Sequence, residues 1–297
     1  MRHVAGVLAF TLMAGCAKDP SGTPLVLGLP APDFGVQLAL APFVIPPNSE
    51  KTECRYLTLP GDGDVDIQRF VSRMREGSHH FLLYRSLVPV SVFQGVCRMD
   101  LPRAVVYGSQ TEDNEQALPP GVALRLPRGS PLIMESHYIN GSDTATTGEV
   151  VLNLQYVDSA TIRNRADVLF FLNQDITIPP LSTTTTSKTC PLPAGVDVFL
   201  LSSHTHRRGR AFTMDLVNAT TGDSLRHLYD SYEWNDPQVV RFPDAAPLQV
   251  GGDQGLRFSC TYRNDDSVTV RWGLSSDDEM CIAVGMYYPS LGIRYCF

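Results

Sequence analysis

Apolar residues in this chain occur in short runs or in alternation with polar ones, and clusters of Pro, Gly, Asn and Asp separate the runs. Residues 150–156 and 196–201 are two such runs, and 268–272 alternates valine with polar residues before a tryptophan. Successive side chains of a strand point to opposite faces, so short runs rich in β-branched and aromatic residues predict antiparallel strands. Helical spacing is not sustained over ten or more residues anywhere in the sequence. We therefore predict an all-β chain built of sandwiches.

The same pattern predicts two domains. Residues 157–160 end one apolar run, and 161–166 are polar before the next run begins. A chain of 297 residues is long enough for two domains that each bury a core. We expect an N-terminal domain over 34–160 and a C-terminal domain over 161–297. Within the second, the threonine run 183–186 is interpreted as a loop without chemistry.

Residues 1–16 resemble a bacterial lipoprotein signal. A short basic start precedes the apolar residues 4–13, a stretch too short to span a bilayer. Small residues then lead to Cys16, as in a lipobox, where the cysteine becomes the lipid-modified first residue. Simple cleavage near Ala14 is the alternative. Residues 17–33 are rich in Pro, Gly and Ser and predict a flexible tether. We expect an exported protein, lipid-anchored to a bacterial membrane, the outer one, on its periplasmic or surface face.

The charge of the chain excludes one class of partner. Its formal net charge is −7, and long runs of Lys or Arg that could contact phosphates are missing. The densest basic cluster is Arg207, Arg208 and Arg210, beside a histidine motif described below. We expect no nucleic-acid partner, and we expect a monomer.

Seven cysteines are present, and Cys16 belongs to the proposed lipobox. The remaining even number in an exported chain predicts three disulfides, because that compartment is oxidising. Pairs of the C-x-x-C type are missing, which disfavours zinc ribbons and thioredoxin-like sites. Spacing alone does not choose among the possible pairings of Cys54, Cys97, Cys190, Cys260, Cys281 and Cys296.

Five of the seven histidines lie in three short groups, which are His79-His80, His137-Tyr138 and His204-Thr205-His206. In a strand His204 and His206 project from one face and could bind one metal ion together. Adjacent histidines face opposite sides of a regular strand, so His79 and His80 need an irregularity, and the preceding Gly-Ser predicts a strand start or bulge. Each group could instead hold ordinary hydrogen-bonded histidines. His227 lies alone and is given no metal role.

The type of metal is suggested by a methionine. A polar turn, 275–279, leads into Met280 and Cys281, and the apolar strand 282–288 follows. A thioether is a soft ligand that suits Cu(I) and is a poor choice for zinc, whereas zinc, copper and manganese proteins all use two histidines spaced by one residue. The alternative is that Met280 only fills a gap in the core.

In chain order these motifs resemble those of the copper type II, ascorbate-dependent monooxygenases, the family of the peptidylglycine α-hydroxylating and dopamine β-monooxygenases. The resemblance spans residues 50–297 and is carried by HH, HY, HTH followed by Arg208-Gly209, and DEMC at 278–281 with MYY at 286–288. It implies two antiparallel jelly-roll-like β-sandwich domains in tandem. It also implies two copper ions per chain, one on each domain, facing each other across a solvent cleft.

The resemblance assigns roles residue by residue. It implies an electron-storing copper held by His79, His80 and His137. It implies a second copper, where dioxygen binds and the substrate C–H bond is broken, held by the catalytic residues His204, His206 and Met280. The disulfides that it implies are Cys54–Cys97, Cys190–Cys296 and Cys260–Cys281.

The function implied is a monooxygenase that hydroxylates a C–H bond of a small organic molecule with O2 and an external one-electron donor, ascorbate or another. The sequence departs from the peptidylglycine enzyme at the carboxylate clamp of that enzyme. Ser202 stands where that enzyme has Arg, and Ile282 and Val284 stand where it has Asn and Tyr. A peptide C-terminus is therefore not expected as the substrate.

Three other classes of protein stay open. A copper carrier or sensor could use the same ligands without catalysis. A zinc hydrolase or cupin would typically need an acidic residue soon after the HTH motif, and 207–214 contains none. A structural sandwich could carry these histidines without binding metal. Metal content and reductant-dependent oxygen uptake separate these classes from one another.

Overall fold

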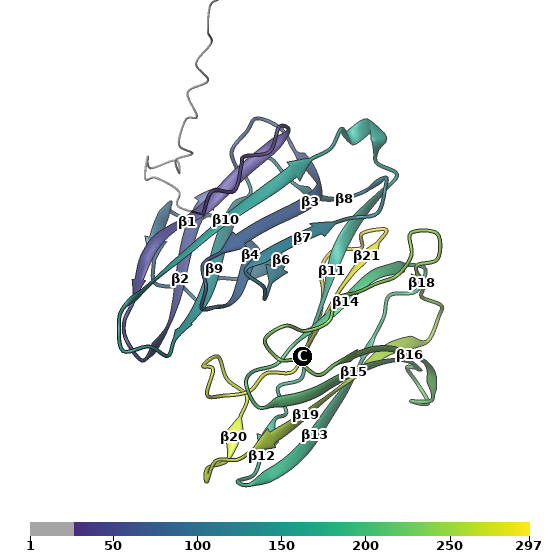
Figure 1. Ribbon diagram of the computed structural model, residues 1–297. Coiled ribbons are helices and arrows are strands. Elements are labelled where there is room, and N and C mark those ends of the chain that lie inside the picture. The colour runs from purple at the N-terminus through teal and green to yellow at the C-terminus, as the bar shows by residue number, and fades with distance from the viewer. Residues whose placement is uncertain (1–26) are drawn as a thin grey trace, which may run out of the picture.

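The computed structural model describes residues 27–297, which form 22 β-strands and one short 3-10 turn, Ser159–Thr161 (Figure 1). No α-helix occurs in this part of the chain, so the prediction of an all-β, sandwich-like protein is confirmed. Between residues 27 and 297 no helix could cross a membrane. The predicted export signal and Cys16 lie outside the described residues. The jelly-roll arrangement and the domain bounds remain predictions.

The N-terminal half packs two groups of strands against each other. One is a five-stranded sheet, in the order β5 (Phe93–Gly95), β2 (Ser49–Thr58), β9 (Pro131–Asn140), β4 (Ser78–Ser86) and β6 (Arg103–Ser109). The other contains β1 (Gly35–Ile45), β10 (Thr146–Tyr156), β3 (Val65–Met74), β7 (Asp113–Ala117) and β8 (Val122–Leu126). Large side chains such as Tyr56, Phe70 and Tyr138 are fully buried between them. The side chains on the inward-facing side of each strand form this core.

The C-terminal half repeats this plan. Its four-stranded sheet has the order β13 (Ser182–Pro191), β19 (Gln254–Asn264), β15 (Gly209–Asn218) and β16 (Ser224–Ser231). A second group contains β11 (Asn164–Leu172), β21 (Ile282–Tyr288), β14 (Asp197–His204), β17 (Val240–Arg241), β18 (Leu248–Gln249) and β22 (Arg294–Cys296). A two-stranded sheet of β12 (Thr177–Ile178) and β20 (Val270–Arg271) lies at the far end (Figure 1). Phe171, Phe258 and Tyr262 belong to its core.

The two halves are joined by strand pairing. β11 runs parallel to β8, with Asn164 opposite Val122, so one sheet of eleven strands continues from the first half into the second. Five buried residues of the second half pack into the hydrophobic core of the first, namely Ala166, Val168, Phe199, Leu200 and Met286. The relative placement of the two halves is therefore set by backbone hydrogen bonds as well as by side-chain packing.

The three disulfides implied by the family resemblance are confirmed. Cys54 bonds to Cys97, Cys190 to Cys296 and Cys260 to Cys281. The last of these joins β19 to the residue that follows Met280.

The loop expected at 183–186 is wrong, because these residues lie in β13 and pair with β19. Threonine is β-branched and favours strands, and hydroxyl pairs across neighbouring strands add to the pairing. Thr185 and Thr261 form such a pair, with 2.8 Å between their hydroxyl oxygens.

The last part of the predicted tether contacts the eleven-stranded sheet. Arg73 Nη1 donates a hydrogen bond to the Leu27 carbonyl, and Asn153 Nδ2 donates one to the Pro30 carbonyl. Residues 27–30 are thereby held against β3 and β10.

Candidate metal centre

The first histidine group lies at a β-bulge. In the pairing of β4 with β9, Ser78 is opposite Tyr138 but His80 is opposite His137, so one extra residue, His79, is inserted. Gly77 precedes it with a φ of 88°, a conformation that suits glycine. The irregularity predicted from the Gly-Ser sequence is confirmed. The ring centroids of His79 and His80 are 5.0 Å apart, and each is 5.4 Å from the ring of His137.

The second group lies at the end of β14. This strand ends at His204, and the ring centroid of His206 is 5.2 Å from that of His204. The backbone beyond the strand is held by a buried carboxylate, because Glu279 accepts hydrogen bonds from the His206 N–H at 3.0 Å and the Arg208 N–H at 2.7 Å. His206 Nδ1 donates to the Asp278 carbonyl at 3.1 Å, which leaves Nε2 of that ring as its ligand atom.

The two groups form one cluster. The ring centroid of His79 is 5.1 Å from that of His204 and 5.4 Å from that of His206. Ligand atoms of His79, His80 and His137 lie within 4.8 Å of one another, and so do those of His79, His204 and His206. His79 therefore belongs to both candidate triads. Contacts between the two halves of the chain bring the two groups together.

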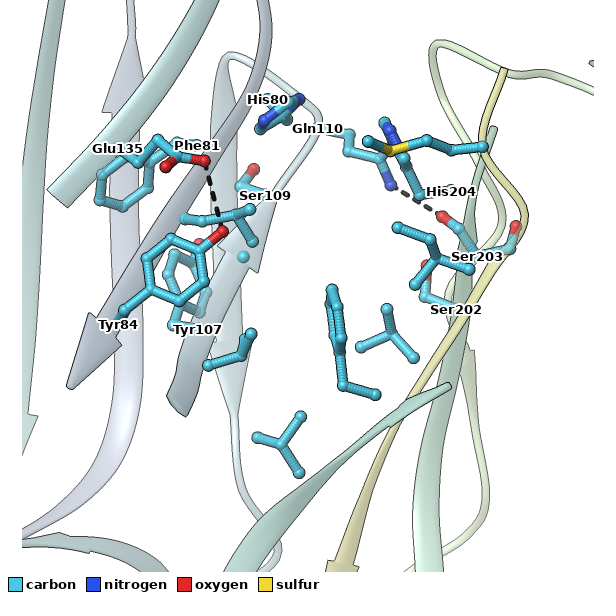
Figure 2. Close-up of a pocket in the computed structure, with 18 of the residues that line it drawn as sticks. His80, Phe81, Tyr84, Tyr107, Ser109, Gln110, Glu135, Ser202, Ser203 and His204 are labelled. Atoms are coloured by element: carbon cyan, nitrogen blue, oxygen red, sulfur yellow. Dashed lines mark hydrogen bonds between the residues drawn. The ribbon is translucent and has the colours of Figure 1, made fainter. Parts of the chain in front are cut away.

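Gln110 makes one of these contacts. It follows β6 in the N-terminal half, and its side chain reaches β14 of the C-terminal half (Figure 2). Its Nε2 donates to the Ser203 carbonyl at 2.8 Å, and its Oε1 accepts from His204 Nδ1 at 2.6 Å. The hydrogen bond fixes the tautomer of His204 and leaves Nε2 as the lone-pair nitrogen.

Glu50 makes another. It lies on β2, and its carboxylate accepts from His137 Nε2 at 3.0 Å, from the Ser275 hydroxyl at 2.6 Å and from the Ser276 N–H at 3.1 Å. Burial acts to raise the pKa of Glu50, but the hydrogen bonds from Ser275 and Ser276, with a smaller contribution from the neighbouring His137, lower it to about 2. Glu50 thus joins a ligand candidate of the first half to the polar turn before Met280.

The cluster is buried and neutral at physiological pH. Burial, with a further contribution from the neighbouring His206 and His137, lowers the pKa of His79 to about 3. Burial also lowers the pKa of His80 and His204 well below the usual value, and that of His137 and His206 to a smaller extent. A neutral imidazole presents a lone pair, which is the form that binds a metal ion.

Three ring nitrogens of the cluster are buried and lack a hydrogen-bond partner. They are His79 Nε2, His80 Nδ1 and His206 Nε2. A buried polar atom without a partner costs about 1–3 kcal/mol, so three in one cluster call for an explanation. Nitrogen ligands for a metal ion provide one. The residues present therefore fit the metal that the sequence predicts.

Met280 lies beside the cluster. It is buried and, with His80 and His204, lines the same cavity. Ile282 is paired with His204 across β21 and β14, which places Met280 two residues beyond that pair. Tyr262 donates a hydrogen bond to the Met280 carbonyl at 2.7 Å. A thioether that lines the same cavity as imidazoles offers a donor set that favours copper over zinc.

The basic residues after the HTH motif pair with acidic residues outside the cavity. Arg208 is buried and forms an ion pair with Asp266, and Arg207 contacts Asp277 at 2.8 Å. Neither arginine lines the cavity. They therefore hold the turn that carries His206 rather than facing a bound molecule.

Gly209 packs against the HTH motif so closely that no side chain fits. A Cβ atom built at this position would lie 2.3 Å from the Thr205 hydroxyl oxygen. We expect Gly209→Ala to displace Thr205 and to lower the free energy of unfolding by about 1–3 kcal/mol, the usual cost of overpacking. Thermal unfolding measures it. Gly63→Ala is the matched control, since a Cβ there would meet no atom within 4 Å. Equal melting temperatures for the two variants would contradict this packing.

The pKa of His79 predicts a pH dependence in the chain stripped of metal by a chelator. Its folded pKa of about 3 lies below the unfolded value of 6.5, so the unfolded chain takes up the proton first as the pH falls. Stability is therefore lost between pH 6.5 and 3, by about 2 kcal/mol at pH 5 for this group. His79→Gln should lose less stability between pH 7 and 5 than the unaltered chain.

Comparing the unaltered chain with His79→Gln isolates the contribution of His79 to the pH dependence of stability. Burial raises the pKa of Glu279 to about 7, which acts in the opposite direction over the same pH range, but this group is present in both proteins. Denaturant titrations at pH 7 and pH 5 give the two differences. The same pH dependence in both would show that His79 protonates in the folded state as easily as in the unfolded one.

Comparison with known proteins agrees with this donor set. Residues 164–297 match the family profile described as "Copper type II ascorbate-dependent monooxygenase, C-terminal domain". The chain is 25% identical over 291 residues to "Putative DBH-like monooxygenase protein 2" of Homo sapiens, covering 87% of this chain and 57% of the relative. It is 27% identical over 105 residues to "DBH-like monooxygenase protein 1" of Gallus gallus, covering 35% of this chain and 17% of the relative. The chain thus spans little more than half of the first relative.

Solved structures give a weaker likeness. The major capsid protein P2 from Bacteriophage PM2 matches 83% of this chain and 97% of its own, with 9% sequence identity and a TM-score of 0.35. The major capsid protein of STIV matches with 7% identity and a TM-score of 0.38. At such scores the likeness carries no argument about function.

Proposed function

We propose that the chain hydroxylates a C–H bond of a small organic molecule, because residues 164–297 match the family profile of the copper type II ascorbate-dependent monooxygenases. The reaction consumes dioxygen, two electrons and two protons, places one oxygen atom in the new hydroxyl group and releases the other as water. Ascorbate or another external one-electron donor supplies the electrons. The observation that carries the proposal is the convergence of five neutral histidines, four of them buried, beside a cavity that Met280 also lines.

The ligand assignment follows the family motifs. His79, His80 and His137 would hold one copper ion, and His204, His206 and Met280 would hold the other. When bound, copper would supply electron storage at the first site and activation of dioxygen at the second. The protein's own contribution is to keep the imidazoles neutral by burial and to fix their tautomers through hydrogen bonds.

A cavity beside the cluster gives the substrate a place. It has a volume of about 1120 Å³, is lined by residues of both halves, and has Met280 in its wall. His80 and His204 also line it (Figure 2). Cavities of this size bind drug-sized molecules. A copper carrier or sensor has no need of such a cavity, which favours the enzyme over that alternative. The soft donor set disfavours the zinc enzyme.

Oxygen consumption tests the proposal. The chain is loaded with copper, and oxygen uptake is followed with ascorbate and a panel of neutral and charged organic compounds. Zinc-loaded protein serves as the control. We expect uptake only with copper and reductant, and one atom of labelled dioxygen in the product by mass spectrometry. Bound copper without reductant-dependent uptake would support the carrier, and binding of zinc alone would support a hydrolase.

We also propose that the chain works as a monomer outside the cytoplasm, attached to a bacterial membrane through a lipid on Cys16. The three disulfides support export, because such bonds persist in oxidising compartments. Cys16→Ala is expected to move the protein from the membrane fraction to the soluble fraction. An unchanged distribution would refute the anchor.

A further inference from the structure

One wall of the cavity is a face of three paired strands, β11, β21 and β14. Along β11 and β21 every second residue lines the cavity, as expected for one face of a sheet. The pairing of the two strands places these residues opposite each other, Val168 with Met286, Phe170 with Val284, and Leu172 with Ile282. All six side chains are apolar. We call this face the apolar wall.

β14 extends the wall on the other side of β21. Leu200 is paired with Met286, Ser202 with Val284 and His204 with Ile282. Ser202 donates its hydroxyl hydrogen to the Gln238 carbonyl at 3.0 Å, so its donor is already used. The wall therefore contains no charged side chain, and His204 stands at one corner of it. A molecule lying on the wall would reach the metal cluster at that corner.

The part of the lining that comes from the N-terminal half has no unpaired buried charge either. Arg103 and Glu135 both line the cavity, but they neutralise each other through a contact of 3.0 Å, and the Tyr84 hydroxyl donates to the same carboxylate at 3.3 Å (Figure 2). The other charged side chains of the lining are exposed to solvent; they are Glu115, Asp236 and Arg241.

Apolar side chains also lie exposed where the cavity reaches the surface. Val96, Met99, Leu274 and Phe297 line the cavity, and their exposed fractions are 83%, 49%, 51% and 66%. Exposed apolar residues gathered in one place commonly mark a binding site. The rim therefore has the same chemical character as the interior wall.

We propose that this cavity binds an uncharged, predominantly apolar organic molecule along the wall of β11, β21 and β14. An ionic group placed on that wall would lose its hydration and gain no partner of opposite charge, which makes binding of an ion unfavourable. As the substrate class of the enzyme, this inference rests on the proposed function: the carbon to be hydroxylated would lie at the His204 corner. As a statement about binding, it stands without the reaction.

Competition between compounds of equal length tests the charge preference. The neutral dye N-phenyl-1-naphthylamine is bound to the metal-free chain at pH 7, and its fluorescence is followed as 1-decanol, decanoate or decylammonium displaces it. We expect decanol to displace the dye at a concentration at least ~10-fold lower than either ion, because only the ions leave a charge unpaired on the wall. Equal or better displacement by either ion would overturn the proposal.

A charged substitution in the apolar wall tests whether the dye binds there. Val284→Arg is expected to weaken dye binding at least ~10-fold, since a cation would then lie in the middle of the apolar wall. Val44→Arg is the matched control, because Val44 is 61% exposed on β1 and does not line the cavity. Unchanged affinity in Val284→Arg would place the dye elsewhere and refute the assignment. The competition experiment uses the unaltered chain, so it decides the charge preference even if Val284→Arg does not fold.

These outcomes separate this inference from the proposed function. Dye binding and competition need neither copper nor a reductant. Preference for decanol without any hydroxylated product would leave the inference standing and remove the proposed reaction. Hydroxylation of charged compounds together with preferential binding of an ion would keep the reaction and remove the inference.

Discussion

His79→Ala is expected to weaken Cu(I) binding at the site of His79, His80 and His137 by at least ~100-fold. The His79 ring lies at the centre of the cluster, 5.0 to 5.4 Å from the rings of His80, His137, His204 and His206. Losing even a partner that only orients a ligand costs about 10–100-fold in metal affinity, so losing a ligand should cost at least as much. Competition with a chromophoric Cu(I) chelator measures the affinities.

Two other histidines provide the comparison for His79. His137→Ala should weaken only the first site, because His137 belongs to one of the two triads. His227→Ala should change nothing, because His227 lies exposed between Asp215 and Asp230. Full Cu(I) affinity at both sites in His79→Ala would show that His79 is not a ligand, and the assignment of the first site would then be wrong.

Met280→Ile is expected to abolish turnover while the fold remains. Isoleucine has a similar volume but lacks the sulfur, so the side of the cavity next to His204 keeps its apolar character and loses its soft donor. We expect reductant-dependent oxygen uptake to fall at least ~100-fold. Met214→Ile is the matched control, since Met214 is fully buried in the second core and does not line the cavity. Turnover that survives Met280→Ile would remove the assignment of the dioxygen site.

The sequence was sufficient for the local features of this fold. Strand alternation predicted the β architecture, and Gly77 before adjacent histidines predicted the bulge that the pairing of β4 with β9 contains. The threonine run 183–186 misled the interpretation because low complexity was given more weight than β-branching. The structure resolves that conflict in favour of a strand.

The contacts that join the halves were not predictable from local patterns. Gln110 and Glu50 lie far along the chain from the histidines that they orient, and neither belongs to a motif with characteristic spacing. Their roles come from the packing of the two halves, which a pattern of strands does not specify. The position of His79 between the two histidine groups has the same origin, because it depends on how closely the second half approaches the bulge.

The apolar wall was predictable only in part. Departures from the carboxylate clamp of the peptidylglycine enzyme were visible at Ser202, Ile282 and Val284. Only the register of β14 with β21 shows that these positions are neighbours on one face. Three separate substitutions thereby become one continuous apolar surface next to His204.

The copper content of the full chain tests the central claim, that histidines from both halves together bind copper. Protein is incubated with excess Cu(I) under anaerobic conditions, freed of loose metal by gel filtration and analysed for metal per chain, with an equal concentration of zinc present in a parallel sample. We predict two copper ions per chain in both samples, because imidazole and thioether donors favour copper. A chain that binds no copper, or that exchanges it for zinc at equal concentration, would contradict the account.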